Sequence, residues 1–320
     1  MKVFITQNLE QEAIDMLKQV AEVKTSGVDR PLSREEFLDG IRDADAIIFV
    51  WHTEQMDKEA FDAAPKVKII ARRGVGYDNF DIEEARRRGV YATVTPVHMN
   101  TIADLTFGLL ITAARRIHRA DAFVRSGGWT EGGVWVARKF MGYDVHNKTL
   151  GIIGFGKIGR LVAKRARGFD MKVLYYDIVR QPEAEAELGA EYADLDDLLA
   201  RSDFVSVNCA LTESSRNLLN RDRIARMKDG AVVVVTARGG IVDEQALYEA
   251  LASGKLGGAG LDVFEPEPIA PDNPLLTLEN VVFTPHLGAS VHETRVKMAV
   301  TAAEDVIRVL KGEKPLYPIF

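Results

Sequence analysis

The fold of this chain is decided by the stretch TLGIIGFGKIGRLVAKRARGFDMKVLYYD at residues 149–177. An apolar run at residues 150–153 leads into the spacing Gly-x-Gly-x-x-Gly, and a second apolar run at residues 172–176 ends at an aspartate. Glycines in this pattern permit a tight turn between a strand and a helix and let the backbone approach a pyrophosphate at the helix N-terminus. The stretch therefore predicts a βαβ unit that binds a dinucleotide, rather than a plain strand-turn-helix. The predicted contacts are Gly154, Phe155, Gly156, Lys157, Ile158, Gly159 and Asp177.

Asp177 bears on which dinucleotide is bound. A carboxylate at the end of the second strand accepts hydrogen bonds from both ribose hydroxyls of NAD and repels the additional phosphate of NADP. Arg180, three residues further on, would attract that phosphate and favours the opposite choice. We expect NAD rather than NADP on the strength of Asp177.

Strands alternate with helical patterns in two long series. The first series covers residues 1–95, and the second runs from residue 149 to about residue 285. Such alternation predicts parallel sheets covered by helices. A chain of 320 residues is longer than one core usually supports, so two α/β domains are expected. Residues 100–125 predict one long helix between the two series, apolar nearly all round in its first half, and residues 290–311 predict a closing helix.

Composition and charge argue against several classes of protein. The net charge is −6 and basic residues are scattered, which disfavours nucleic acid as a partner. The apolar stretch at residues 101–114 contains Asp104 and is too short to cross a membrane, and the N-terminus lacks the apolar run of a signal peptide. Cys209 is the one cysteine, and no Cys/His cluster has the spacing of a metal site. We expect a cytoplasmic protein without a metal ion.

Three charged side chains follow apolar runs in the second series. They are Arg238 in VVVTARGG, Glu267 in LDVFEPEP and His286 in TPHLGAS. In an open parallel sheet, ligands bind where the strands end. A guanidinium could clamp a carboxylate, and a carboxylate beside a histidine would raise the histidine pKa so that the imidazole could protonate a nascent alkoxide. The competing interpretation is a structural ion pair between Arg238 and Glu267, with His286 capping a loop.

The order of these motifs resembles that of the D-isomer-specific 2-hydroxyacid dehydrogenases. The likeness also includes RRGVGYDNFDIEEARRRGV and RADAFVRSGGW, so it covers nearly the whole chain. Within the family, IARRGVGYDN, FMGYDV and PEAEAELGAEY are most similar to glyoxylate/hydroxypyruvate reductases. The resemblance implies two doubly wound parallel-sheet domains with a cleft between them. A flavodoxin-like substrate domain would comprise residues 1–99 and 290–320, a Rossmann NAD-binding domain residues 100–289, and two copies would form a homodimer.

The resemblance also implies roles for individual residues. His286 would exchange the proton with support from Glu267, and Arg238 would hold the carboxylate and carbonyl of the substrate. Other implied contacts are the amides of Val75 and Gly76 on the substrate carboxylate, Asp262 on the nicotinamide carboxamide, and Cys209, Thr236, Ala237 and Gly288 along the cofactor.

The chain departs from the family pattern at three places. Val235 and Ala210 stand where the family often has asparagine and proline, and the loop TPVHMNTIADL is one residue shorter than usual. None of these changes removes a predicted catalytic group, but they make the substrate less certain than the reaction class. Trp135 is placed either to reach a partner's pocket or to pack, and Trp51 and His52 follow a strand that could border the substrate.

The leading functional hypothesis is an NAD-dependent reductase of a small 2-keto acid such as glyoxylate or hydroxypyruvate. One alternative is a D-3-phosphoglycerate dehydrogenase, for which Arg72 and Arg73 could form a phosphate pocket. A second, of another class, is an NADH-sensing protein similar to the corepressors that resemble this family.

Overall fold

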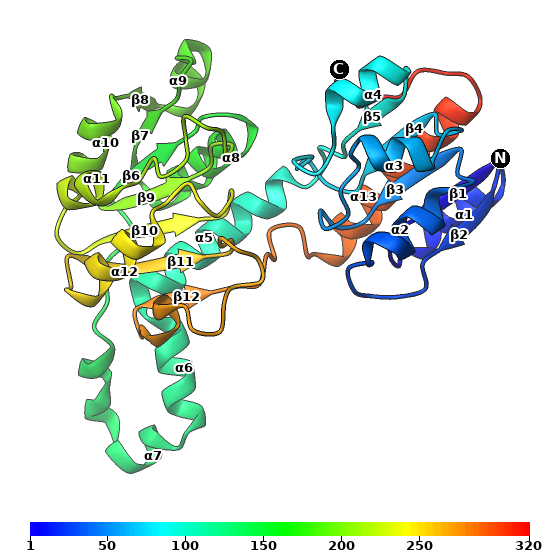
Figure 1. Cartoon of the computed structure of the whole chain (residues 1–320). Coiled ribbons are helices and arrows are strands. Elements are labelled where there is room, and N and C mark those ends of the chain that lie inside the picture. The colour runs from blue at the N-terminus through cyan, green and yellow to red at the C-terminus, as the bar shows by residue number, and fades with distance from the viewer. The chain divides into compact units, whose positions relative to one another are not determined.

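The computed structural model describes residues 1–320 and divides into two compact units. The first unit comprises Met1–His98 and Ala289–Phe320, and the second comprises Met99–Gly288 (Figure 1). Each unit contains one parallel sheet covered by helices. The predicted fold class, two doubly wound parallel-sheet α/β units, is confirmed.

The sheet of the first unit has the strand order β2-β1-β3-β4-β5. Its central strand β3 reads AIIF and is buried along its whole length, as expected for a strand covered on both faces. The strands are β1 (Lys2–Ile5), β2 (Glu22–Thr25), β3 (Ala46–Phe49), β4 (Ile69–Arg72) and β5 (Tyr91–Thr93). The helices are α1 (Gln11–Lys18), α2 (Arg34–Ile41), α3 (Lys58–Ala63), α4 (Ile82–Arg88) and α13 (His292–Leu310).

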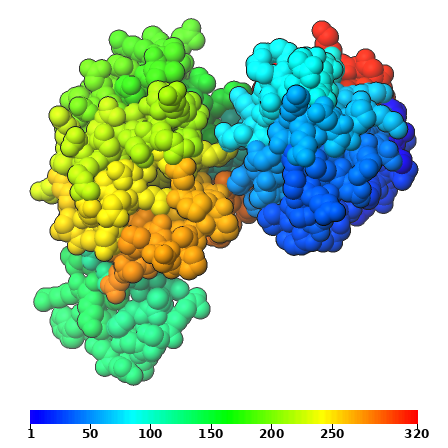
Figure 2. Space-filling model, in the orientation of Figure 1, coloured from blue at the N-terminus to red at the C-terminus, as the bar shows by residue number.

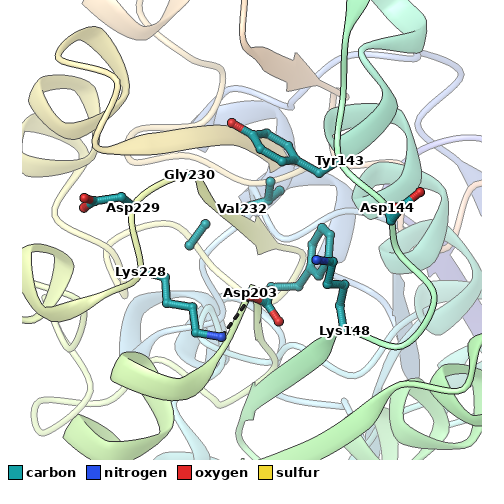
Figure 3. A pocket seen from close by; sticks show the side chains of 10 residues that line it. Tyr143, Asp144, Lys148, Asp203, Lys228, Asp229, Gly230 and Val232 are labelled. Carbon is teal, nitrogen blue, oxygen red and sulfur yellow. Dashed lines mark hydrogen bonds and ion pairs between the residues drawn. The ribbon is translucent and has the colours of Figure 1, made fainter.

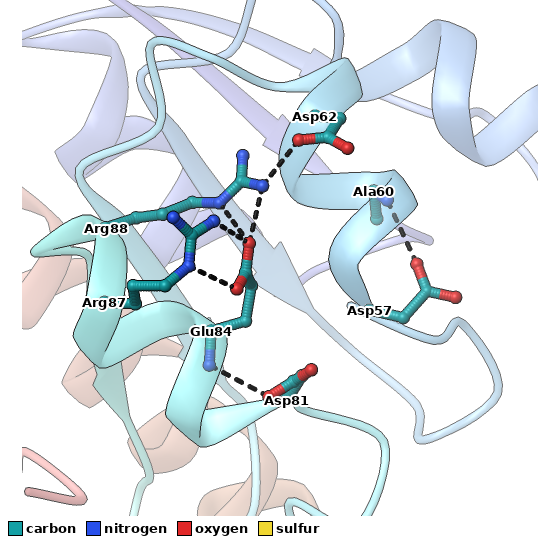
Figure 4. Close-up of polar contacts among 7 residues, drawn as sticks. All are labelled: Asp57, Ala60, Asp62, Asp81, Glu84, Arg87 and Arg88. Atoms are coloured by element: carbon teal, nitrogen blue, oxygen red, sulfur yellow. Dashed lines mark hydrogen bonds and ion pairs between the residues drawn. The ribbon is translucent and has the colours of Figure 1, made fainter.

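Charged side chains join α3 to α4 in this unit. The Glu84 carboxylate on α4 accepts hydrogen bonds from Arg87 and Arg88, and Arg88 also pairs with Asp62 on α3 (Figure 4). Asp81 caps the N-terminus of α4 by accepting from the Glu84 amide at 2.9 Å. Arg88 is thus the member of the run 86–88 that links the two helices, whereas Arg86 and Arg87 pair with glutamates within α4.

The sheet of the second unit has the order β12-β11-β10-β9-β6-β7-β8, with every pair parallel. The chain order reverses direction between β6 and β9, which makes a switch point where ligands bind in such sheets. The strands are β6 (Thr149–Ile153), β7 (Lys172–Tyr176), β8 (Ala190–Tyr192), β9 (Phe204–Val207), β10 (Ala231–Val235), β11 (Leu256–Leu261) and β12 (Val281–Phe283). The helices are α5 (Met99–Arg115), α6 (Ile117–Arg125), α7 (Gly128–Gly132), α8 (Lys157–Ala166), α9 (Pro182–Leu188), α10 (Leu195–Arg201), α11 (Arg221–Arg226) and α12 (Glu244–Ala252), with 3₁₀ turns η1 (Val134–Phe140), η2 (Arg167–Phe169) and η3 (Pro274–Thr277).

The prediction of one helix over residues 100–125 is wrong. The helix breaks at Arg116, which adopts a left-handed backbone conformation with φ 53°, so that α5 and α6 are separate elements. α5 packs against β10, β11 and α8, whereas α6 has no buried residue. The apolar stripe that required cover on all sides ends with α5.

An arm formed by α6, α7 and η1, residues 117–140, projects from the rest of the second unit (Figures 1 and 2). None of its three elements contains a buried residue. Its exposed apolar side chains include Trp129, Val134 and Trp135. The Gly127-Gly128 and Gly132-Gly133 pairs lie at the two ends of the short helix α7.

A pocket of about 200 Å³ opens beside the residues that precede β6, β9 and β10 (Figure 3). Asp203 organises it by accepting from the Thr149 amide and from the Lys228 ammonium, each at 2.9 Å. These bonds hold together the starts of the three strands, at the end of the sheet opposite the Gly-rich turn.

No helix in the structure has both the length and the apolar character needed to span a lipid bilayer.

Candidate active site

The Gly-rich turn has the geometry that a pyrophosphate requires. A side chain at Gly154 would come within 2.5 Å of the Cys209 amide nitrogen, and one at Gly159 within 2.1 Å of the Gly154 carbonyl oxygen. Both glycines are therefore needed for close packing of the turn and of α8. Beside Gly156 there is open space, which a side chain would fill. The turn and the N-terminus of α8 thus fit a dinucleotide phosphate.

Asp177 lies beside this turn and is tied to it. One of its carboxylate oxygens accepts from the Phe155 amide at 2.6 Å, and the other accepts from the Val179 amide at 3.2 Å. Ile178 is 88% exposed and Val179 58%, so an apolar surface stands open next to the carboxylate. This surface suits the flat face of an adenine. Sequence reasoning missed it, although two aliphatic residues after a strand-ending aspartate were a visible signal.

Cys209 follows β9, and its backbone packs against Gly154 in the Gly-rich turn. Burial raises the pKa of its thiol to about 11, and the nearby Asp177 adds to the effect. The thiol is therefore protonated at neutral pH and does not act as a nucleophile.

The three predicted catalytic side chains follow three neighbouring strands of one sheet. Arg238 comes after β10, Glu267 after β11 and His286 after β12. In a parallel sheet the carboxyl ends of adjacent strands lie on one edge, so the loops that carry these residues share that edge with the Gly-rich turn.

Backbone packing explains the glycine pair after Arg238. A side chain at Gly239 would overlap the Phe264 carbonyl, at 2.0 Å, and Gly240 has φ 77°. The TARGG loop therefore runs directly against the loop that carries Glu267. The Arg238 guanidinium donates to the Ala237 carbonyl at 2.8 Å. Thr236 is held by a hydrogen bond of 2.9 Å between its hydroxyl and that of Thr106 on α5.

Glu267 and His286 form a hydrogen-bonded pair. The imidazole Nδ1 lies 2.7 Å from Glu267 Oε2, while Glu267 Oε1 accepts from the Phe264 amide at 3.0 Å. The side chains of both residues are partly buried, His286 at 32% exposure and Glu267 at 20%. This bond engages Nδ1 and fixes the orientation of the imidazole.

Asp262 holds the loop in which His286 lies. Its carboxylate accepts from the Thr284 hydroxyl at 2.6 Å and from the Leu287 and Gly288 amides at 2.7 and 2.9 Å. Its carbonyl accepts from the His286 amide at 2.9 Å. Asp262 is 1% exposed, and burial raises its carboxyl pKa against the lowering effect of these donors.

Val75 and Gly76 lie in the first unit, in the turn after β4. Arg72 braces this turn: its Nε donates to the Gly76 carbonyl at 3.0 Å and its Nη1 to the Phe49 carbonyl at 3.4 Å. The Thr95 amide holds the Gly74 carbonyl at 2.7 Å. The turn is thus held through the carbonyls of Gly74 and Gly76.

The remaining singled-out residues lie in different places. Trp51 and His52 follow β3 in the first unit, and Trp51 is 39% exposed. Trp135, in the arm, is 78% exposed and packs into no core. No group of three or more His, Cys, Asp and Glu side chains is arranged to hold a metal ion.

Residues 107–288 match the family model described as the NAD binding domain of D-isomer specific 2-hydroxyacid dehydrogenases. A glyoxylate reductase from Thermococcus kodakarensis is 47% identical over 316 residues, which cover 98% of this chain and 94% of that protein. Among solved structures, a Thermus thermophilus protein is 40% identical with a TM-score of 0.93, and each chain is covered completely. An NADPH-dependent glyoxylate/hydroxypyruvate reductase from Sinorhizobium meliloti is 27% identical with a TM-score of 0.85, covering 99% of this chain and 97% of that one.

Proposed function

The chain belongs to the D-isomer specific 2-hydroxyacid dehydrogenase family, and from this premise we propose that it reduces glyoxylate or hydroxypyruvate with NADH. Family membership makes it an NAD(P)-dependent oxidoreductase that acts on the CH–OH group of 2-hydroxy acids. The observation that carries the proposed reduction is the 2.7 Å pair of Glu267 and His286, held at the same sheet edge as the Gly-rich turn, and the likeness to glyoxylate reductases supports the choice of substrate.

The two units are assigned different tasks in this proposal. The unit Met99–Gly288 contains the Gly-rich turn and would bind the cofactor. The unit formed by Met1–His98 and Ala289–Phe320 would bind the substrate. These bounds differ by one residue from the expected domain limits of 99 and 290.

Proton transfer is assigned to His286. When bound, the nicotinamide supplies a hydride to the keto carbon. As negative charge develops on the keto oxygen, His286 Nε2 donates its proton to that oxygen. Glu267 keeps Nδ1 in its hydrogen bond and stabilises the charged imidazole, and the Phe264 amide fixes Glu267 in turn.

Substrate binding is assigned to Arg238 and to the turn after β4. Arg238 would hold the carboxylate and the carbonyl oxygen by paired hydrogen bonds. In the first unit, the amides of Val75 and Gly76 are assigned to the substrate carboxylate, since Arg72 and Thr95 already bind the carbonyls of that turn.

The alternative of a phosphorylated substrate loses its main support at Arg73. The side chain of Arg73 is 5% exposed and pairs with Glu10 at 3.1 Å, and Glu10 also binds Arg295 at 3.0 Å. A phosphate would have to compete with this carboxylate. Burial lowers the pKa of Arg73, which is a further sign that this guanidinium is withdrawn from solvent.

We expect His286→Ala to lower kcat by at least about 100-fold, because a well-placed general acid contributes about 10²- to 10⁴-fold in rate. Steady-state kinetics with glyoxylate and NADH measure the effect, and a thermal melt checks that the variant is folded. His146→Ala, at an exposed position, is the matched control and should keep full activity. An active His286→Ala enzyme would rule out the assigned proton donor.

A substrate panel separates the remaining functions. The values of kcat/KM for glyoxylate, hydroxypyruvate and phosphorylated hydroxypyruvate, each with NADH and with NADPH, should be highest for the two unphosphorylated acids with NADH. A preference for the phosphorylated acid would favour a phosphoglycerate dehydrogenase. Tight NADH binding without turnover of any keto acid would favour the NADH-sensing class.

A cytoplasmic location and a homodimer belong to the same proposal. The location is supported by a single cysteine, which suits a reducing compartment. The homodimer is supported by the exposed apolar side chains of the arm, which lack cover within one chain.

A further inference from the structure

Arg180 stands where an arginine would be expected to favour NADP. It lies three residues beyond Asp177, just after β7, and an arginine near that carboxylate position is the group that accommodates a 2′-phosphate. In this structure the Arg180 guanidinium is already bonded. Its Nε donates to Glu185 Oε1 at 2.8 Å and its Nη2 to Glu185 Oε2 at 3.0 Å. Such two-point pairing is the strongest geometry between these groups.

Glu185 is in turn held to the sheet. The Tyr175 hydroxyl donates to Glu185 Oε1 at 2.6 Å and accepts from the Gln181 amide at 2.8 Å. The Tyr175 ring is fully buried, and its centroid lies 3.9 Å from that of Phe155 in the Gly-rich turn. The carboxylate is therefore anchored by the same packing that builds the cofactor turn.

The charge of Arg180 is compensated in this arrangement. The bonds from Arg180 and Tyr175 lower the pKa of Glu185 to about 2, so the carboxylate is ionised at any pH near neutrality. The guanidinium carbon also lies 5.7 Å from the centroid of the Tyr192 ring. Arg180 thus presents little of its positive charge to an incoming anion.

We propose that Glu185 is a cofactor-specificity determinant, which withholds the Arg180 guanidinium from the 2′-phosphate of NADP. The inference rests on the proposed use of NADH at the Gly-rich turn. A 2′-phosphate would be repelled by the Asp177 carboxylate and would find the Arg180 guanidinium already paired with Glu185. The side chain of Arg180 is 62% exposed, so it can turn toward the phosphate once Glu185 loses its charge.

The test compares the affinities of the full chain for adenosine 5′-monophosphate and adenosine 2′,5′-bisphosphate, which differ only in the 2′-phosphate. Isothermal titration calorimetry gives the ratio of the two Kd values without reference to turnover. Glu185→Gln keeps the side-chain shape and an acceptor for Tyr175. We expect it to shift the ratio about tenfold in favour of the bisphosphate, with the affinity for the monophosphate unchanged. Glu183→Gln, an exposed position on the same helix, is the matched control and should leave the ratio as it is.

Two further variants decide whether Arg180 is the group released. Arg180→Ala alone should leave the ratio unchanged, and Arg180→Ala combined with Glu185→Gln should abolish the gain. An unchanged ratio in Glu185→Gln overturns the proposal. A gain that survives in the double variant also overturns it. Weaker bisphosphate binding in Arg180→Ala alone would overturn it as well, and this measurement can still be made if Glu185→Gln does not fold. Wild-type protein that binds neither the monophosphate nor NADH would instead refute the proposed function.

Discussion

His286 adopts a backbone conformation that few residues other than glycine take up. Its φ of 54° lies in the left-handed region, at a cost on the order of 1–2 kcal/mol for a side chain with a Cβ. Asp262 offsets this cost because its carbonyl binds the His286 amide and its carboxylate binds the next two amides. The loop that carries the imidazole is therefore held by Asp262, the residue directly after β11. Since both oxygens of Asp262 are used within the loop, we regard it as a positioning residue.

Asp262→Asn should lower kcat between about 10- and 100-fold, because a small displacement of His286 is enough to spoil alignment for proton transfer. Asparagine offers one acceptor oxygen where the aspartate uses two, and its amide would oppose a backbone N–H. Thr284→Val removes only one of the donors and should have a smaller effect. Kinetics together with thermal melts distinguish a positioning role from a purely structural one. An Asp262→Asn enzyme with normal kcat and a lower Tm would show that Asp262 has a purely structural role.

At the scale of elements, what the sequence predicted depends on how deeply each element is buried. The apolar runs of β6 and β7 were predicted from the sequence because strands that are covered on both faces are apolar along most of their length. The strand β2 (EVKT) has no such apolar run because it lies at the sheet edge and is half exposed, and β8 (AEY) has only three residues. The break at Arg116 carries neither glycine nor proline, so no local signal marks it.

The ion pairs of Glu84 with Arg87 and Arg88 within α4 lead to a prediction about acid stability. The hydrogen bond from Arg87, with a smaller contribution from Arg88, holds the pKa of Glu84 at about 2, well below its usual value. A carboxyl whose folded pKa is depressed stabilises the fold above its unfolded pKa, and this contribution is lost as the pH falls toward the folded pKa. Glu84→Gln should therefore lower Tm at pH 7, and the difference from wild type should shrink as the pH falls from about 4.5 to about 2.

The measurement is a series of thermal melts between pH 7 and pH 2. Glu83→Gln, on the same helix and 81% exposed, is the control and should show a smaller pH-dependent difference. A Tm difference that stays constant over this range would mean that the charge of Glu84 does not contribute.

At the scale of the whole molecule, the candidate site draws on residues far apart in the sequence. Arg238, Glu267 and His286 could be predicted because each follows a buried strand and because the motif order resembles a known family. The contacts that adjust the site could not, since they join side chains whose proximity follows only from the register of strands and helices. The bond of Thr106 to Thr236, the hold of Asp262 on its loop and the pairing of Glu185 with Arg180 are of this kind.

The exposed arm, residues 117–140, leads to a prediction about the oligomeric state. Val134 is 74% exposed and Trp135 78%, and such side chains on a segment without a buried core indicate an interface. If two copies bury their arms against each other, replacing both residues by serine removes apolar contact from the interface. The wild-type chain should elute as a dimer in size-exclusion chromatography with light scattering, and Val134→Ser/Trp135→Ser should dissociate at micromolar concentration.

Ile178→Ser provides the matched control for this measurement. Ile178 is also aliphatic and is 88% exposed, but it lies beside Asp177 and outside the arm, so its replacement should leave the dimer intact while weakening cofactor binding. The double arm variant should show the reverse, with lost dimerisation and an unchanged Kd for NADH. The two effects are separable because the cofactor turn and the arm share no residues. A dimer that survives the arm substitutions would show that the interface lies elsewhere, on the second unit or on the first.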